Sequence, residues 1–152
     1  MTDLQRLFSD LIRFETELWN AVDARLRSDF DLPMSRFEPM QVIAHHQPCR
    51  VYDIAHELSI TVGGTSKLIN RIEASGYCLR RVNPADHRSS IIELTAAGRE
   101  IFAAATAAFD EELQIRLGSA LSARALSQLQ TTLTRLRSTG ADIDMKEGAP
   151  RR

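Results

Sequence analysis

Polar and cationic side chains gather in residues 61–71, a stretch that otherwise has the apolar spacing of a helix. The side chains that form hydrogen bonds or carry positive charge there are Thr61, Thr65, Ser66, Lys67, Asn70 and Arg71. Hydroxyl and amide groups suit the edges of nucleic-acid bases, and ammonium and guanidinium groups suit phosphates. This chemistry indicates recognition of a polar, anionic surface rather than bond breaking.

Two glycines, Gly63 and Gly64, stand at the start of the same predicted helix. Each glycine in a helix costs about 1 kcal/mol relative to alanine, so the pair needs a reason. One explanation is a loosely wound first turn. The other is a close approach of the helix backbone to DNA, where a Cβ atom would collide. Both explanations remain open, and the second places the two glycines among the DNA-binding residues.

A second polar stretch, "NPADHR", lies between "YCLRRV" and "SSIIEL", two short runs typical of β-strands. The stretch is rich in turn residues and longer than a two-residue hairpin loop. Asn83 and Pro84 turn the chain, and Arg88 projects from the tip, where an arginine can enter a minor groove. Because phosphate would repel Asp86, its expected role is to hold Arg88 or a neighbouring backbone group in position.

The local charge favours an anionic partner, although the 152-residue chain has a net charge of −1. Between Ser59 and Ile91, five cations and two anions leave a balance of +3. A patch of this size can meet several phosphates, and its binding would weaken as salt rises. Any nucleic-acid contact must come from this patch, since the whole chain is not a polycation.

The apolar periodicity predicts the helices and strands that position these residues. We expect helices over 3–27, from a cap at Ser35 to about His46, around 51–58, and before a stop at Gly76. Two strands follow, and then two long helices capped by Thr95 and Ser122. The fold class is therefore mainly α with a small β-hairpin wing, that is, a winged helix-turn-helix with flanking helices.

The terminal helices carry more apolar surface than a single buried face requires. The first helix has two apolar lines: Leu4, Leu7, Leu11, Phe14 and Leu18, and beside them Phe8, Ile12, Trp19, Val22 and Leu26. The last helix has a heptad-like seam made of Leu126, Leu129, Leu133 and Leu136. We favour a subunit interface over the central helix of a monomer. The expected parts are a dimerisation helix (1–30), a DNA-binding lobe (34–95), C-terminal dimerisation helices (96–139) and a flexible tail (140–152).

The block "VYDIAHELSITVGGTSKLINRIEASGYCLRRVNPADHR", followed by "SSIIELTAAGRE", resembles the MarR family of bacterial winged-helix regulators over residues 4–139. The resemblance implies a homodimeric transcription regulator, more often a repressor, that reads a pseudo-palindromic operator in double-stranded DNA. It implies that the residues of 61–71 named above face the major groove, that Arg88 enters the minor groove and that Arg80 and Arg81 meet phosphates. His87 stands where arginine is commoner, so we expect a mild pH dependence of DNA binding.

The resemblance also implies a small aromatic or phenolic effector, bound between the dimer helices and the DNA-binding lobe. Residues that would line such a pocket are Arg13, Trp19, Phe37, Met40 and His45. Arg13 would meet the anionic group of the ligand. Core packing is the competing explanation for Trp19 and Met40.

Other kinds of site have weaker support. His45, His46 and Cys49, with His56 nearby, suggest a metal site, but Pro48 breaks the helix between them, so we expect no metal and no cofactor. Redox sensing by Cys49 or Cys78 is a second alternative, and a helical protein-interaction module is a third. The chain has no GxSxG, P-loop or HExxH motif, so we expect no enzyme activity.

The remaining sequence features concern the cellular compartment in which the protein is found. The first residues carry charges throughout and have no secretory apolar region. No apolar run approaches the ~18 residues that a membrane span needs. The two cysteines have neither zinc spacing nor a CxxC form. We therefore expect a cytoplasmic protein with reduced thiols.

Overall fold

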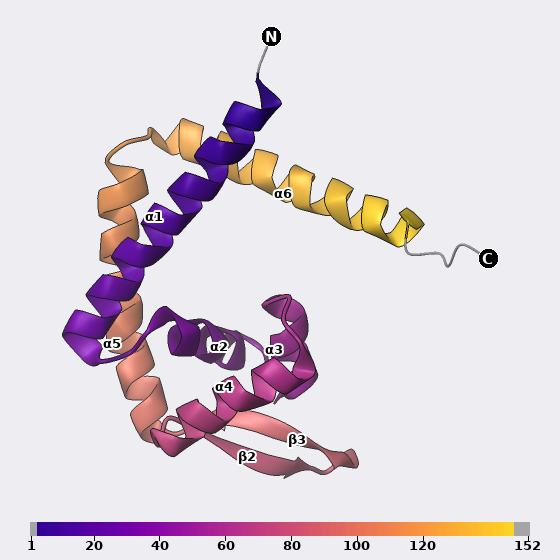
Figure 1. Ribbon diagram of the computed structural model, residues 1–152. Coiled ribbons are helices and arrows are strands. Elements are labelled where there is room, and N and C mark those ends of the chain that lie inside the picture. Colours follow the sequence, from indigo (N-terminus) through magenta and orange to yellow (C-terminus); the bar gives the residue numbers. More distant parts are fainter. Residues whose placement is uncertain (1–2, 148–152) are drawn as a thin grey trace. The chain divides into compact units, whose positions relative to one another are not determined.

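The computed structural model describes residues 3–147, in two compact units divided at residues 112 and 113. The elements of the first unit are α1 (Leu4–Phe30), α2 (Met34–His45), β1 (Cys49–Arg50), α3 (Val51–Glu57), α4 (Val62–Ala74), β2 (Cys78–Asn83), β3 (Asp86–Leu94) and α5 (Ala96–Leu113), which ends at the division (Figure 1). The second unit holds a π-helical turn (Gln114–Gly118) and α6 (Ala123–Glu147). This order confirms the predicted winged helix-turn-helix class.

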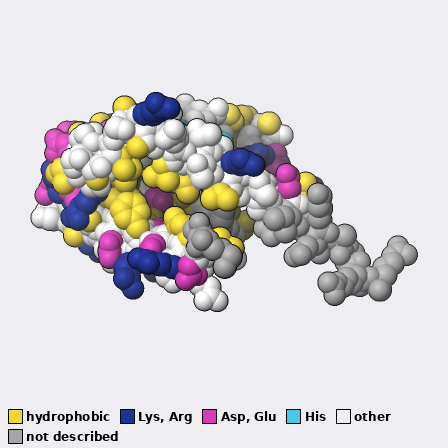
Figure 2. Space-filling model, turned by 90° about the horizontal axis from the view of Figure 1, so that it is seen from above, with side chains coloured by type: hydrophobic (Ala, Val, Ile, Leu, Met, Phe, Trp, Pro, Cys, Tyr) yellow, Lys and Arg dark blue, Asp and Glu magenta, His cyan; other side chains and the backbone are white. Residues whose placement is uncertain are grey.

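Helix α1 is buried only toward its C-terminal end. Asp3 caps its start by accepting hydrogen bonds from the N–H groups of the first turn. Val22 and Leu26 are buried in the unit, whereas Leu4 and Phe8 are 74% and 66% exposed. Hydrophobic side chains also lie on the surface that Figure 2 shows. The first half of α1 therefore presents unburied apolar side chains, as a subunit interface requires.

The junction of α1 and α2 depends on Asp23 rather than on the expected cap at Ser35. Oδ1 of Asp23 accepts a hydrogen bond of 2.7 Å from the N–H of Met34, and Asp23 also pairs with Arg27. Burial by itself would raise the pKa of Asp23, but these hydrogen bonds and the charge of Arg27 outweigh it and lower that pKa. Helix α2 thus begins one residue before Ser35, with Pro33 as its N-cap residue.

The core of the first unit gathers around α2. Phe37 has no exposed surface, and its ring lies 5.5 Å from that of Phe102 and 5.2 Å from that of Phe109, both on α5. Ile69 and Ile72 of α4 are equally buried. Rings at these distances pack favourably, so α2 joins α5 to the winged helix-turn-helix.

The sheet has three antiparallel strands in the order β1-β3-β2. Strand β1, which pairs Cys49 with Ile92, was not predicted. The expected long loop is also wrong: Asn83 pairs with Asp86, so the hairpin loop is only Pro84 and Ala85. A register shift between Val82 and Asn83 lets the strands continue almost to the tip.

The link between the wing and α5 is tightly packed. Thr95 caps α5, because its Oγ1 accepts a hydrogen bond from the N–H of Gly98 and donates one to the carbonyl of Gly76. Gly76 follows the end of α4 with φ of +79°, which confirms its role as a helix stop. A Cβ atom on Gly98 would lie 1.9 Å from the carbonyl oxygen of Tyr77. Only glycine fits at this contact.

In the second unit, Ser122 caps α6 as predicted, through a hydrogen bond from the N–H of Ala125. The seam residues Leu129, Leu133 and Leu136 are 37%, 42% and 58% exposed. Helix α6 continues to Glu147, beyond the boundary expected at 139, and residues 148–152 of the predicted tail lie outside the described residues. Across 3–147, no helix is both long and apolar enough to cross a membrane.

Candidate nucleic-acid interface

Helix α4 has one buried face and one exposed stripe. Thr65, Ile69 and Ile72 are buried at spacings of four and three. The exposed positions on the opposite side are Gly63, Lys67, Asn70, Arg71 and Ala74. These spacings place them along one line of a helix, and we call them the α4 stripe. The stripe collects three of the six polar side chains that the sequence singled out: Lys67, Asn70 and Arg71.

Thr65 departs from the prediction. Its side chain has no exposed surface, and its Oγ1 donates a hydrogen bond of 2.8 Å to the carbonyl of Thr61, one turn earlier. A hydroxyl that bonds the preceding turn is satisfied without solvent, so threonine can occupy a core position. Thr65 therefore supports the helix from inside and does not face outward.

The two glycines have different surroundings. Thr61 is the N-cap of α4, and its Oγ1 accepts a hydrogen bond of 3.0 Å from the N–H of Gly64. A Cβ atom on Gly64 would approach that same Oγ1 to 3.1 Å, so the cap itself favours glycine there. Nothing lies within 4 Å of a Cβ atom built on Gly63. For Gly63, in contrast to Gly64, no contact within the described chain explains why the residue is glycine.

Arg80 links the wing to α4. One of its nitrogens donates a hydrogen bond of 2.7 Å to Oδ1 of Asn70, and the other pairs with Glu73. Arg80 shares the inner face of β2 with buried Cys78, so its side chain reaches α4 instead of solvent. The guanidinium expected to meet phosphate is thus committed inside the lobe.

Arg81 points to the other face of β2 and pairs with Glu93 of β3 at 2.6 Å. Once Arg80 and Arg81 are paired, three cations of residues 59–91 have no ion pair within the described part of the chain: Lys67, Arg71 and Arg88. The positive charge is therefore concentrated on the α4 stripe and at the wing tip.

Side chains of the wing tip form hydrogen bonds with its own backbone. Asn83 accepts a hydrogen bond from the N–H of Ala85, and Asp86 accepts one of 3.0 Å from the N–H of Arg88. This agrees with the expectation that Asp86 fixes a neighbouring backbone group. The side chains of His87 and Arg88 are exposed. The carboxylate thus orders the residue that carries the exposed guanidinium.

The residues predicted for an effector pocket do not form one within this unit. Phe37 and Met40 have no exposed surface and belong to the core. Arg13 and His45 are exposed, and Trp19 is half-buried on a shallow surface beside Glu15 and Thr16. Sequence periodicity marks a buried side chain but does not separate core packing from the wall of a cavity.

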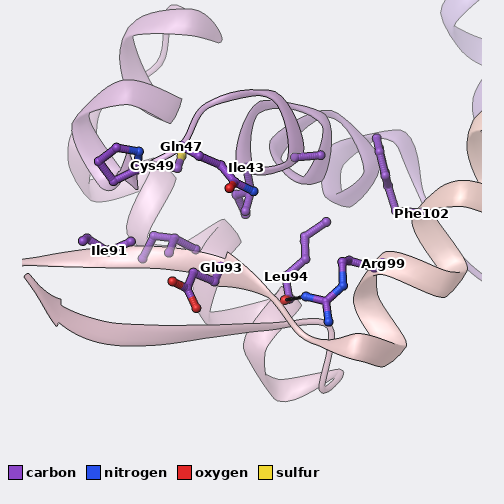
Figure 3. Close-up of a pocket in the computed structure, with 11 residues that line it drawn as sticks. Ile43, Gln47, Cys49, Ile91, Glu93, Leu94, Arg99 and Phe102 are labelled. Carbon is purple, nitrogen blue, oxygen red and sulfur yellow. Dashed lines mark hydrogen bonds between the residues drawn. The ribbon is translucent and has the colours of Figure 1, made fainter.

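A cavity of about 470 Å³ lies elsewhere, between the end of α2, strand β3 and the start of α5 (Figure 3). Its lining residues are Ile43, Ala44, Gln47, Pro48, Cys49, Ile91, Ile92, Glu93, Leu94, Arg99 and Phe102. The guanidinium of Arg99 donates a hydrogen bond of 2.8 Å to the carbonyl of Leu94. No sequence motif predicted Arg99 or Glu93 as part of a cavity. The one sequence feature that could have indicated Arg99 is its place in the first turn of the helix capped by Thr95, directly after Gly98.

The cysteine and histidine alternatives lose support. Cys49 and Cys78 are both buried, and burial, with a nearby carboxylate in each case, raises the pKa of each thiol to about 11. Reactive cysteines need the thiolate and an accessible sulfur, and neither thiol meets these requirements. Among the residues that the structure describes, no three His, Cys, Asp or Glu side chains are grouped to hold a metal ion.

Comparison with known proteins relates part of the chain to one family. Residues 32–90 match the model of the MarR family. An uncharacterised HTH-type transcriptional regulator of Bacillus anthracis is 32% identical over 88 residues, which is 58% of this chain and 57% of that protein. YfiV of Bacillus subtilis, also an uncharacterised HTH-type regulator, is 29% identical over 47% of this chain and 45% of its own length. The chain thus spans about half the length of the curated relatives it matches.

Solved structures share the fold over most of the chain. AbsC, a MarR family transcriptional regulator from Streptomyces coelicolor, has a TM-score of 0.84 at 19% identity and covers 93% of this chain and 97% of its own. The S. aureus MepR–DNA complex has a TM-score of 0.77 at 28% identity and covers 91% of this chain and 99% of its own. The winged lobe and the matched segment therefore agree in their similarity to MarR family transcriptional regulators.

Proposed function

We propose that the protein is a homodimeric transcription regulator, acting as a repressor, that binds a pseudo-palindromic operator through the α4 stripe and the wing tip. The observation that carries the proposal is the placement of the cations that have no ion pair in the described chain. Lys67 and Arg71 lie on the exposed side of α4, and Arg88 lies at the wing tip. A recognition helix in the major groove beside a wing in the minor groove uses cations at these two places.

The similar structures support this proposal. MepR of S. aureus, at 28% identity, was solved with DNA, and so was Sco3205 of Streptomyces coelicolor, at 21% identity and a TM-score of 0.81. Gly63 also fits the proposal, since no contact inside the described chain excludes a side chain there. DNA pressed against the helix backbone would exclude a side chain at this position.

A second copy of the chain is the proposed partner of the apolar side chains on α1. A subunit interface removes such side chains from water, and each buried CH₂ contributes about 0.8 kcal/mol. Phe8, which is 66% exposed, tests this partner. We expect Phe8→Glu to shift the sedimentation coefficient from dimer to monomer and Arg6→Glu, also exposed and on the same helix, to leave the dimer intact. A Phe8→Glu protein that stays dimeric at micromolar concentration would contradict this interface.

We also propose that a small aromatic anion releases the operator. The cavity of Figure 3 supports this part, because it combines apolar walls with the guanidinium of Arg99. A ligand acts only through its different affinity for the DNA-binding and non-binding dimers. Titrating a salicylate-like probe should lower the affinity of the wild-type protein for its operator, and Arg99→Gln should reduce that effect. Equal release from both proteins would argue against this cavity.

The test of the main proposal is selection of bound sequences from a random duplex pool at a fixed, stated salt concentration. We expect an inverted repeat with half-sites about one helical turn apart. The matched control carries Lys67→Ala and Arg88→Ala, two exposed positions at which the fold should tolerate alanine, and it should enrich nothing. No enrichment by the wild-type protein at low salt would favour the alternative of a protein-interaction module.

A further inference from the structure

We infer that Arg80 fixes the amide of Asn70 so that Asn70 presents its NH₂ donors to DNA, and that the base it reads is guanine, adenine or thymine in preference to cytosine. The inference rests on the proposed function and adds a rule of base recognition to it. Arg80 is a positioning residue in this arrangement, and Asn70 is the residue that reads the base.

The orientation of the Asn70 amide follows from hydrogen-bond chemistry. A guanidinium has donors and no acceptor, so the group that faces Arg80 at 2.7 Å must be the amide oxygen. The usual ambiguity between the oxygen and nitrogen of an amide is therefore absent. Because the two atoms diverge from one carbon, the NH₂ group is directed away from Arg80. Asn70 is exposed, and its NH₂ group donates to no other group of the described chain.

Arg80 itself is held firmly. It lies on β2 opposite Ile92, on the inner face of the sheet, and its second nitrogen pairs with Glu73 of α4. Glu73 and Asn70 are three residues apart on one helix face, so a single guanidinium bridges both. Only 27% of the Arg80 side chain is exposed, which disfavours its release to a phosphate.

The consequence for base recognition is specific. An asparagine that reads adenine in the usual bidentate way accepts from N6 and donates to N7. Here the oxygen is turned toward Arg80 and away from the exposed side, so the NH₂ group is what faces DNA and only the donation remains. In the major groove, guanine offers N7 and O6, adenine offers N7 and thymine offers O4, whereas cytosine offers only a donor. A donor facing a donor leaves both groups unpaired, and this disfavours cytosine.

The experiment compares selected sequence profiles of the wild-type protein and three variants. The operator position whose base preference changes in the Asn70→Ala variant is the position that Asn70 contacts. There, the wild-type protein should disfavour cytosine by roughly threefold to tenfold against each of the other bases, the range expected for one hydrogen bond. Arg80→Met frees the amide oxygen and should narrow the preference to adenine. Arg80→Lys keeps a cationic donor and should retain the wild-type profile.

A second measurement uses the wild-type protein alone, so it does not depend on the folding of any variant. Adenine at the Asn70 position is replaced by purine, which lacks the N6 amino group, or by 7-deazaadenine, which lacks the N7 acceptor. Only the 7-deaza analogue should weaken binding. The inference is overturned if removing the N6 amino group weakens binding, or if cytosine is selected as often as the other bases at the Asn70 position. It is also overturned if Asn70→Ala changes the base preference at no operator position, or if Arg80→Met keeps the wild-type profile. Absence of any selected duplex would instead refute the proposed function.

Discussion

Among the glycines that the structure describes, Gly98 is the one at which an added methyl group should cost most stability. A Cβ atom there would lie 1.9 Å from the carbonyl oxygen of Tyr77 and 2.7 Å from its carbonyl carbon. Tyr77 cannot retreat easily, because its carbonyl accepts a hydrogen bond from Thr95 and its N–H donates one to Ile72. Relief requires a backbone shift of about 1 Å at the junction of the wing and α5, since real Cβ atoms keep about 3 Å from such atoms.

The expected cost of Gly98→Ala combines two opposing terms. Overpacking a well-packed site costs about 1–3 kcal/mol, and the rigid backbone contact places this site at the upper end. Alanine recovers up to about 1 kcal/mol of helix propensity. We therefore expect a net loss of about 2 kcal/mol or more in the free energy of unfolding. In urea, this corresponds to a fall in the midpoint of about 1 M or more.

The assay is urea unfolding followed by circular dichroism at one protein concentration, because the stability of a dimer depends on concentration. Gly63→Ala is the matched control: it is the same change, also within a helix, but nothing lies within 4 Å of the new Cβ atom. The control should be unchanged or more stable by up to about 1 kcal/mol. The reasoning fails if Gly98→Ala unfolds at the wild-type midpoint, or if the control loses as much stability.

Three further predictions concern charge and titration. Arg88→Ala should lower operator affinity and reduce the slope of log affinity against log salt by about one, measured by fluorescence anisotropy at several salt concentrations; an unchanged slope would remove Arg88 from the phosphate-facing surface. Asp23 has a lowered pKa in the folded state, so its contribution to stability is present above about pH 4, the unfolded pKa, and is lost as the pH falls through the folded value. Asp23→Asn should therefore be less stable than the wild-type protein at pH 7, with the difference shrinking below pH 4, and a pH-independent difference would contradict the pairing. Cys49 and Cys78, with pKa values near 11, should react with iodoacetamide at pH 8 at least about a hundredfold more slowly than in the urea-unfolded chain; fast reaction of the folded protein would reopen the redox alternative.

The sequence predicted the elements that repeat a pattern and missed those that depend on a neighbour. Helix α4 and the wing follow from periodicity, and the stops and caps at Gly76, Thr95 and Ser122 follow from local backbone chemistry. Strand β1 has only two residues, so it carries no alternation of its own. It is a strand only because β3 is long enough to pair with it.

The second kind of error concerned which of the predicted site residues are buried. Thr65 is polar by type, yet its hydroxyl is satisfied by the carbonyl one turn earlier, so the residue packs as a small apolar side chain. Phe37 and Met40 were placed in a pocket, but both fill the core. In each case the residue type was compatible with two environments, and only the packing of distant segments decides between them.

Arg80 and Arg81 show why the charge of a patch cannot be read from its composition. The two arginines are neighbours in the sequence, and because successive side chains of a strand alternate, they lie on opposite faces of the sheet. One reaches into α4 to bridge Asn70 and Glu73, and the other pairs with Glu93 across the hairpin. Pairing two cations of the patch weakens its non-specific attraction for phosphates and leaves the remaining charge beside the residues that we propose read bases. A regulator that must find one operator among many other sequences gains from that exchange, because the non-specific, salt-dependent part of its affinity falls while the base contacts persist.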